Sequence, residues 1–85
     1  MKKLDELSIA DLNHEVAFAR HRFPGNALLL AALFEEGGEL AKELLQRGGR
    51  ERVRKEALQV ACVAMRIYEE GDATFSDVTD AQAKK

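Results

Sequence analysis

Apolar residues recur along the first part of the chain every three or four positions, which is the spacing of an amphipathic helix. The recurring residues are Leu12, Val16, Ala19 and Phe23. They predict a helix from about Ile9 to Arg22, with Ser8 and Asp11 at its start. Pro24 disfavours helical geometry in the residue before it, so the first helix is expected to end there.

Two further helices follow, joined by a tight turn. The second is expected from about Ala27 to Gln46, with Asn26 as its N-cap, and its first half, ALLLAALF, is apolar on every side. The third is expected from about Arg50 to Glu70, with Gly71 ending it. The turn at 47–49, Arg-Gly-Gly, is short enough to fold the third helix back antiparallel to the second.

Composition supports an all-α fold in one domain. The chain has 85 residues, 46% of them hydrophobic, and one proline. We expect a core from about residue 8 to 72 and a polar C-terminal tail, 73–85, in which Phe75 and Val78 pin a short terminal helix. A chain this short buries only ~60% of its extended surface. We therefore expect an antiparallel helical hairpin plus an N-terminal helix, completed to a four-helix-bundle type of assembly by homo-oligomerisation, as a homodimer or homotetramer.

Charge and cysteine content disfavour several classes of protein. Thirteen basic and fifteen acidic residues give a net charge of −2, without the basic excess of a protein that binds a nucleic acid polymer. The longest apolar run, 27–34, is too short to span a membrane, and the N-terminal residues lack the apolar stretch of a signal peptide. Cys62 is alone, so no intramolecular disulfide forms, and we expect a cytoplasmic protein.

A carboxylate interrupts the apolar face of the second helix. At ~3.6 residues per turn, Glu36 continues a row of leucines. That row is Leu29, Leu33, Leu40 and Leu44. An ionised carboxylate on such a face needs a cationic partner, because desolvation costs several kcal/mol. Gly37 and Gly38 each cost about 1 kcal/mol relative to alanine, which favours close approach of another group to the backbone. These features predict a metal-binding helix.

The hairpin is expected to bring more polar residues to the same level. Counted from the turn at ~1.5 Å per residue, Glu39 and Glu56 lie at nearly equal heights, and Glu36 and Gln59 lie one helical turn farther. The four side chains are expected at one locus, with Glu35 as an additional ligand. Three carboxylates and an amide oxygen suit a hard divalent cation, Mg²⁺, with Mn²⁺ as the alternative.

Here the sequence resembles a known family. The pattern Glu-Glu-x-x-Glu-Leu at 35–40, followed by Glu-x-x-Gln at 56–59 within KEALQVACVAMRI, resembles the MazG-like all-α nucleoside triphosphate pyrophosphohydrolases over residues 18–72. The resemblance implies Mg²⁺-dependent hydrolysis of (d)NTPs to the monophosphate and pyrophosphate, by dimers or tetramers. Carried over by position, Glu36, Glu39 and Glu56 match metal ligands and the catalytic carboxylates, and Gln59 stands where the family has aspartate.

The resemblance also implies how the remaining parts of the site are filled. An amide at position 59 keeps an oxygen ligand but removes one negative charge, so weaker metal binding is expected, and Glu35 offers compensation. Cations are needed to hold phosphates. The candidates are Lys42, Arg50, Arg54 and Lys55. Base recognition is expected from the first helix and the following loop, through Phe18, His21, Arg22 and Phe23.

Two other interpretations stay open. In the first, the acidic residues form a solvated helix face, neutralised by pairs such as Glu39 with Lys42 and Arg52 with Glu56. In the second, the chain is a non-catalytic or weakly active helical dimerisation or nucleotide-binding regulatory module, whose metal site is weakened through Gln59.

Several residues outside the motif are expected to be structural. Cys62 is predicted to be a small core residue, and Tyr68 is predicted to be half-buried. Glu69, Glu70 and Asp72 are predicted to be solvated at the end of the third helix.

Overall fold

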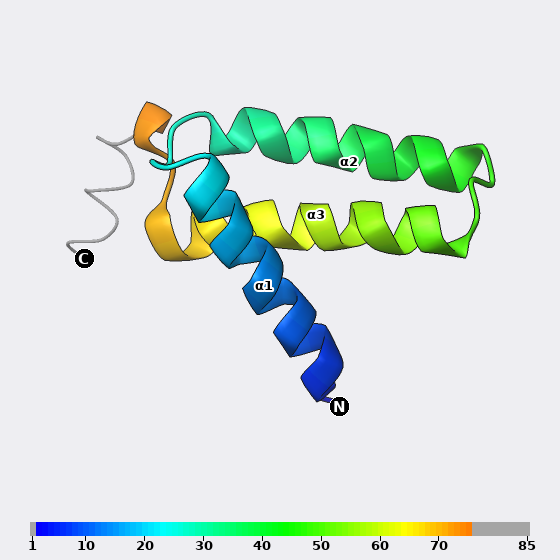
Figure 1. Cartoon of the computed structure of the whole chain (residues 1–85). Coiled ribbons are helices and arrows are strands. Elements are labelled where there is room, and N and C mark those ends of the chain that lie inside the picture. Colours follow the sequence, from blue (N-terminus) through cyan, green and yellow to red (C-terminus); the bar gives the residue numbers. More distant parts are fainter. Residues whose placement is uncertain (1, 76–85) are drawn as a thin grey trace.

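The computed structural model describes residues 2–75, and within them the chain is all-α. The elements are α1 (Glu6–Arg22), α2 (Leu29–Leu45), α3 (Arg50–Glu70) and the short 3-10 helix η1 (Ala73–Phe75). Figure 1 shows α2 and α3 side by side and antiparallel, with α1 crossing α3 obliquely. The predicted hairpin with an additional N-terminal helix is therefore confirmed. Val78 lies outside the described residues.

Capping interactions shift the starts of the first two helices from their predicted positions. α1 begins at Glu6, three residues before Ile9, because the Asp5 side chain accepts a hydrogen bond of 2.7 Å from the backbone N–H of Ser8. The prediction that Ser8 is the cap is therefore wrong. α2 begins at Leu29 instead of Ala27, and Leu28 adopts a left-handed conformation with φ 62° in place of a predicted N-cap at Asn26.

The turn between α2 and α3 forms where the glycine pair predicts it. Arg47 and Gly49 both have positive φ, 53° and 96°, and the Gly48 N–H donates to the Glu43 carbonyl at 2.8 Å. The bounds of α3 match the prediction, and Gly71 ends the helix with its N–H bonded to the Ile67 carbonyl.

Asp72 holds the start of α2 from a position 42 residues along the chain. Its carboxylate accepts hydrogen bonds from the backbone N–H of Leu30 at 2.7 Å and of Thr74 at 2.9 Å, and the residue is only 5% exposed. The hydrogen bond from the Leu30 N–H, together with those from Thr74, keeps the pKa of Asp72 below its ordinary value. Asp72 thus supplies a cap and a negative charge at the positive end of α2, and the prediction that it is solvated is wrong.

A buried arginine fastens the loop between α1 and α2 to α3. Arg66 is 4% exposed and donates to the backbone carbonyls of Phe23, at 3.3 Å, and of Gly25. Its charge is balanced by Glu70, whose carboxylate also accepts from Arg20 of α1 at 2.7 Å. These bonds lower the pKa of the Glu70 carboxyl. Glu70 is therefore part of an ion-pair network that joins α1, the loop and α3.

Glu69 belongs to the same network, because Arg20 also donates to its carboxylate at 2.6 Å. The predicted solvation is confirmed for Glu69, whose side chain is 48% exposed, and is wrong for Glu70, which is half-buried, as well as for Asp72. On the loop itself, Asn26 donates from its side chain to the Glu70 carbonyl at 2.6 Å. The loop is thus held by side-chain bonds at both of its ends.

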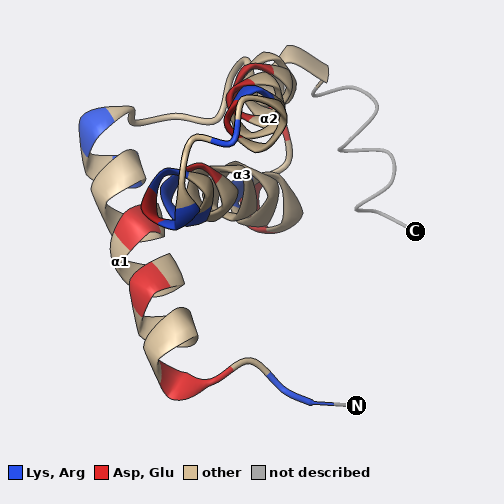
Figure 2. Cartoon of the chain, turned by 90° about the vertical axis from the view of Figure 1, so that its right-hand side faces the viewer, with Lys and Arg blue, Asp and Glu red and all other residues tan. Residues whose placement is uncertain are grey.

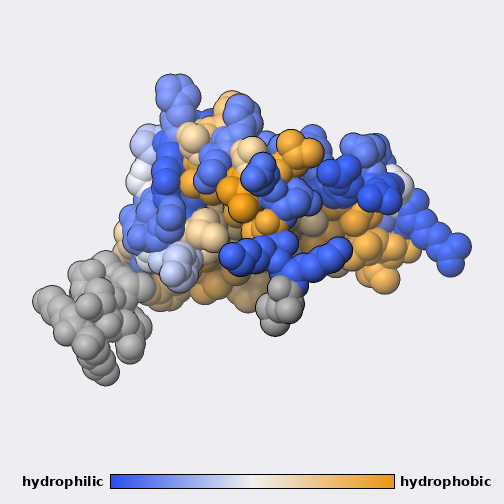
Figure 3. Space-filling view, turned by 90° about the horizontal axis from the view of Figure 1, so that it is seen from below, coloured by the Kyte–Doolittle hydropathy of each residue, from blue (hydrophilic) through white to orange (hydrophobic). Residues whose placement is uncertain are grey.

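The single chain buries few apolar residues. Within the described part, those in the core are Val16, Leu29 and Cys62. The prediction for Cys62 is confirmed, whereas Tyr68 is 84% exposed, which contradicts its predicted half-burial. Large apolar side chains are exposed on all three helices, and Figure 3 shows apolar groups at the surface between hydrophilic ones. Those on or next to α2 are Leu28, Leu30, Phe34, Leu44 and Leu45.

Charged residues of both signs share the surface of the bundle. The hairpin end of α3, which faces the viewer in Figure 2, carries basic residues interspersed with acidic ones. No helix among residues 2–75 has both the length and the apolar character needed to cross a membrane.

Candidate metal and nucleotide site

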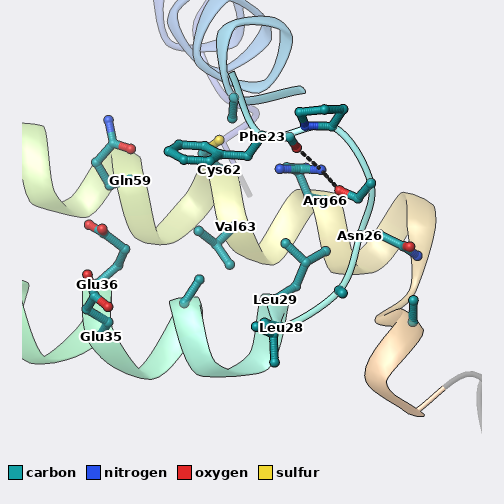
Figure 4. Close-up of a pocket in the computed structure, with 16 residues that line it drawn as sticks. Phe23, Asn26, Leu28, Leu29, Glu35, Glu36, Gln59, Cys62, Val63 and Arg66 are labelled. Carbon is teal, nitrogen blue, oxygen red and sulfur yellow. Dashed lines mark hydrogen bonds between the residues drawn. The ribbon is translucent and has the colours of Figure 1, made fainter. Parts of the chain in front are cut away.

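A cavity of about 580 Å³ lies between the first half of α2 and the second half of α3. The end of α1 and the loop at 23–28 close its remaining sides (Figure 4). One end is polar, with Glu35 and Glu36 from α2 and Gln59 from α3. The middle is apolar, and the far end contains the buried guanidinium of Arg66. The apolar residues that line the cavity include Ala19, Phe23, Leu29, Ala32, Cys62 and Val63.

The structure brings Glu36 and Glu56 together across the hairpin. Burial raises the pKa of the Glu36 carboxyl, and the neighbouring Glu56 carboxyl raises it further through charge repulsion. The charges of Glu35 and Glu39 act in the same direction more weakly. Glu36 and Glu56 are half-buried, whereas Glu35 and Glu39 are exposed. Glu36 thus stands at the polar end of the cavity, and the carboxyl with the largest electrostatic effect on it is that of Glu56, which is not part of the cavity lining.

Gln59 makes a contact that sequence reasoning did not anticipate. Its amide Nε2 donates to Oε2 of Glu15 on α1 at 3.0 Å. Glu15 is half-buried and precedes the core residue Val16. The only feature of the sequence that points to burial of Glu15 is its position next to Val16. The contact with Gln59 itself depends on where α1 crosses α3, which the sequence pattern does not predict.

Carboxylates and an amide oxygen are donor groups of the kind that bind magnesium. Among residues 2–75, no three acidic, histidine or cysteine side chains lie close enough to hold a metal ion by themselves. The expected group of Glu36, Glu39 and Glu56 is therefore not formed by the side chains as they lie. Mg²⁺, however, is commonly bound by one or two carboxylates, with waters and substrate phosphates completing its coordination. Two carboxylates and the Gln59 amide meet that requirement.

The predicted phosphate-binding residues do not line this cavity. Arg54 and Lys55 line a separate depression between α1 and α3, together with Ser8 and Asp11. Arg54 also lies 3.7 Å from Glu51. The cation that does line the cavity is Arg66, which no motif or spacing in the sequence had singled out.

The other basic candidates lie on the surface. Lys42 is exposed on α2, and Arg50 is exposed at the start of α3. Arg22 is exposed too, and its guanidinium stacks over the Phe23 ring at 5.5 Å from the ring centre. Of the residues expected to recognise a base, Phe23 alone lines the cavity, whereas Phe18 and His21 are exposed on α1.

The glycine pair of α2 is not explained by packing within one chain. A Cβ atom added at Gly37 or Gly38 would meet no atom within 4 Å. The expected close approach to the backbone at these positions is therefore absent from the described part of the chain.

Comparison of the chain with protein-family models, with curated proteins and with solved structures gives no match.

Proposed function

We propose that this protein is a Mg²⁺-dependent nucleoside triphosphate pyrophosphohydrolase, which converts a (d)NTP to the (d)NMP and pyrophosphate. The observation that carries the proposal is a cavity of about 580 Å³ whose polar end is lined by Glu35, Glu36 and Gln59, with the Glu56 carboxyl acting on Glu36 from α3. That volume falls within the ~300–1,000 Å³ range of small-molecule sites. The resemblance of the motif at 35–40 and 56–59 to MazG-like enzymes supports the same conclusion.

Each part of the cavity has a task in this reaction. Glu36, Glu56 and the amide oxygen of Gln59 hold the cation, which supplies positive charge against the phosphate oxygens when bound. Glu35 and Glu39, at the exposed edge, add negative charge that attracts it. The apolar middle takes up the nucleoside, with the ring of Phe23 and the side chain of Leu29 as walls.

The reaction also needs a group that accepts a proton. Hydrolysis between the α and β phosphates requires water to attack phosphorus and to lose a proton, while the pyrophosphate leaves. With Glu36 engaged by the cation, Glu35 is the other carboxylate of the cavity lining and would accept that proton.

We also propose that two or four copies complete the helical bundle. The support is the apolar surface of α2, where Phe34 is 74% and Leu45 is 84% exposed. A second copy that packs against this surface would remove it from water, which is the main driving force for association.

The decisive experiment is a pyrophosphate-release assay with a panel of dNTPs and Mg²⁺. The wild type is expected to release pyrophosphate from at least one nucleotide, and Glu36→Gln is expected to lose that activity. Glu51→Gln, which removes an equal charge from an exposed position on α3, serves as the matched control and should remain active. Absence of release from every nucleotide would refute the proposal.

A second candidate function is a nucleotide-binding regulatory module without turnover. The observation that favours it is that the described residues include no three acidic, histidine or cysteine side chains placed to hold a metal ion, while the Gln59 amide bonds to Glu15. Such a module would bind nucleotide in the same cavity and release no pyrophosphate. Its nucleotide affinity would fall in variants of the apolar wall, such as Leu29→Ala, whereas Glu36→Gln would leave its oligomeric state unchanged.

A further inference from the structure

The side chain of Gln59 reaches two regions of the molecule. Its amide nitrogen bonds to Glu15 of α1 at 3.0 Å, and the residue also lines the cavity beside Glu36. Figure 4 shows the amide nitrogen of Gln59 on the side away from the Glu36 carboxylate. Gln59 also lies three residues after Glu56, on the same face of α3. It therefore connects α1 to the carboxyl pair.

The chemistry of this hydrogen bond determines which atom of the amide is left free. An ionised carboxylate only accepts hydrogen bonds, whereas a primary amide has a donating NH₂ group on one side and an accepting oxygen on the other. Glu15 must therefore face the NH₂ group of Gln59. The amide oxygen is then the atom left for a group in the cavity.

We propose that Glu15 is a positioning residue, which holds the Gln59 amide so that its oxygen is offered to a divalent cation bound by Glu36 and Glu56. This inference rests on the proposed function, because it concerns the same cation. Ligands of metal ions are commonly fixed in this way by an outer hydrogen-bonding partner. Without Glu15, the amide could turn its NH₂ group toward the cation, which would repel it.

The contact with Glu15 also explains why an amide stands at position 59. A carboxylate there would face the Glu15 carboxylate at hydrogen-bonding distance, and two like charges so close oppose each other's ionisation. The loss of charge at Gln59 is thus offset by the charge of Glu15 nearby. Substitution of Gln59 by an acid alone should therefore weaken cation binding.

An exchange of the two side chains tests this explanation. In the double variant Glu15→Gln, Gln59→Glu, the amide on α1 donates to the carboxylate on α3. The hydrogen bond and the total charge are both retained, and one carboxylate oxygen stays free for the cation. The exchange should therefore recover the cation affinity that Gln59→Glu alone loses.

Cation affinity is measured by calorimetric titration of Mn²⁺ into the full-length, metal-free protein. The four α,β-imido deoxynucleoside triphosphates are present, and a titration without protein is subtracted. Glu15→Leu, which has no acceptor for the Gln59 amide, and Gln59→Glu are each expected to raise the Kd by about 10-fold or more. The double variant is expected to return close to the wild-type Kd. Glu6→Gln, which removes an exposed charge from the same helix, is expected to match the wild type.

The outcomes separate this inference from the proposed function. If the wild type binds Mn²⁺ and Glu15→Leu binds it equally well, Glu15 has no positioning role, and the proposed function stands. If urea unfolding shows that the single variants lose stability while their Mn²⁺ affinity is unchanged, the hydrogen bond between Gln59 and Glu15 is merely structural. Glu15 then has no positioning role either, and the proposed function stands. If the wild type takes up no Mn²⁺, both the inference and the proposed function are overturned.

Discussion

Replacement of Glu36 by glutamine should make the metal-free protein more stable, although it should abolish activity. Burial and the adjacent Glu56 carboxyl raise the pKa of Glu36, so the folded protein holds that proton more tightly than the unfolded chain does. The folded state therefore loses stability as the pH rises through the ordinary pKa of a glutamate toward the raised one. Glutamine has nearly the same shape and no charge, so it removes this cost at neutral pH.

The size of the effect follows from the exposure of the pair. Two like charges at close range in a site that water still reaches repel each other by about 1 kcal/mol. Because Glu36 and Glu56 are half-buried, where the effective dielectric constant is lower than in bulk water, that value is the minimum expected. For a domain of this length, 1 kcal/mol corresponds to a rise in Tm of about 4–8 °C.

The assay is thermal unfolding followed by circular dichroism, in buffer with a metal chelator, at pH 7 and in steps down to pH 4. The advantage of Glu36→Gln should shrink as the pH falls, because Glu36 of the wild type then becomes neutral too. Glu51→Gln, at an exposed position, should unfold within about a degree of the wild type. A Glu36→Gln variant that is less stable at pH 7, or whose advantage does not change with pH, would refute the reasoning.

Three further predictions concern the frame around the cavity. Arg66→Leu should lower the free energy of unfolding in urea by about 3 kcal/mol, because it leaves the paired Glu70 charge and two loop carbonyls without their donor. Asp72→Asn should lower the Tm at pH 7, and the difference should close as the pH falls below about 4, since the depressed pKa of Asp72 contributes stability only while the carboxyl is ionised. Gly38→Ala should raise the stability of the single chain by about 1 kcal/mol, because its added Cβ meets no other atom.

Each of these predictions has its own control or contrary result. Arg52→Leu, at a side chain that is 74% exposed, is the matched control for Arg66, and an equal loss in the two variants would contradict a special role for Arg66. For Asp72, a pH dependence of Tm that is the same in variant and wild type would exclude the carboxylate cap. A loss of stability in Gly38→Ala, together with dissociation in sedimentation experiments, would show that a second copy packs against this glycine.

The local signals in the sequence were sufficient for the helical hairpin. Apolar spacing and the glycine pair at 48–49 predict α3 to within its observed bounds, because those features act between neighbouring residues. Counting the helical rise from the turn also identifies Glu36 and Glu56 as residues at similar levels, and their carboxyls do lie close together. The hairpin and the carboxyl pair thus follow from short-range geometry.

The sequence could not predict the features that depend on the packing of α1 and of the chain end. Asp72 caps α2 across 42 residues, and it displaces the local candidate Asn26, whose side chain bonds to α3 instead. The bond of Glu15 to Gln59 depends on where α1 crosses α3, which no periodicity encodes. The burial of Arg66 could not be predicted either, because it depends on the loop carbonyls that accept its hydrogen bonds.

The most direct test of the proposed cation site is an anomalous difference map from crystals grown with Mn²⁺ and an α,β-imido deoxynucleoside triphosphate. We expect a peak within about 2.0–2.3 Å of carboxylate oxygens of both Glu36 and Glu56, with the phosphates of the analogue completing the coordination. The Gln59 amide oxygen should face the same peak. A map with the analogue bound in the cavity and no anomalous peak between these two residues would contradict the account.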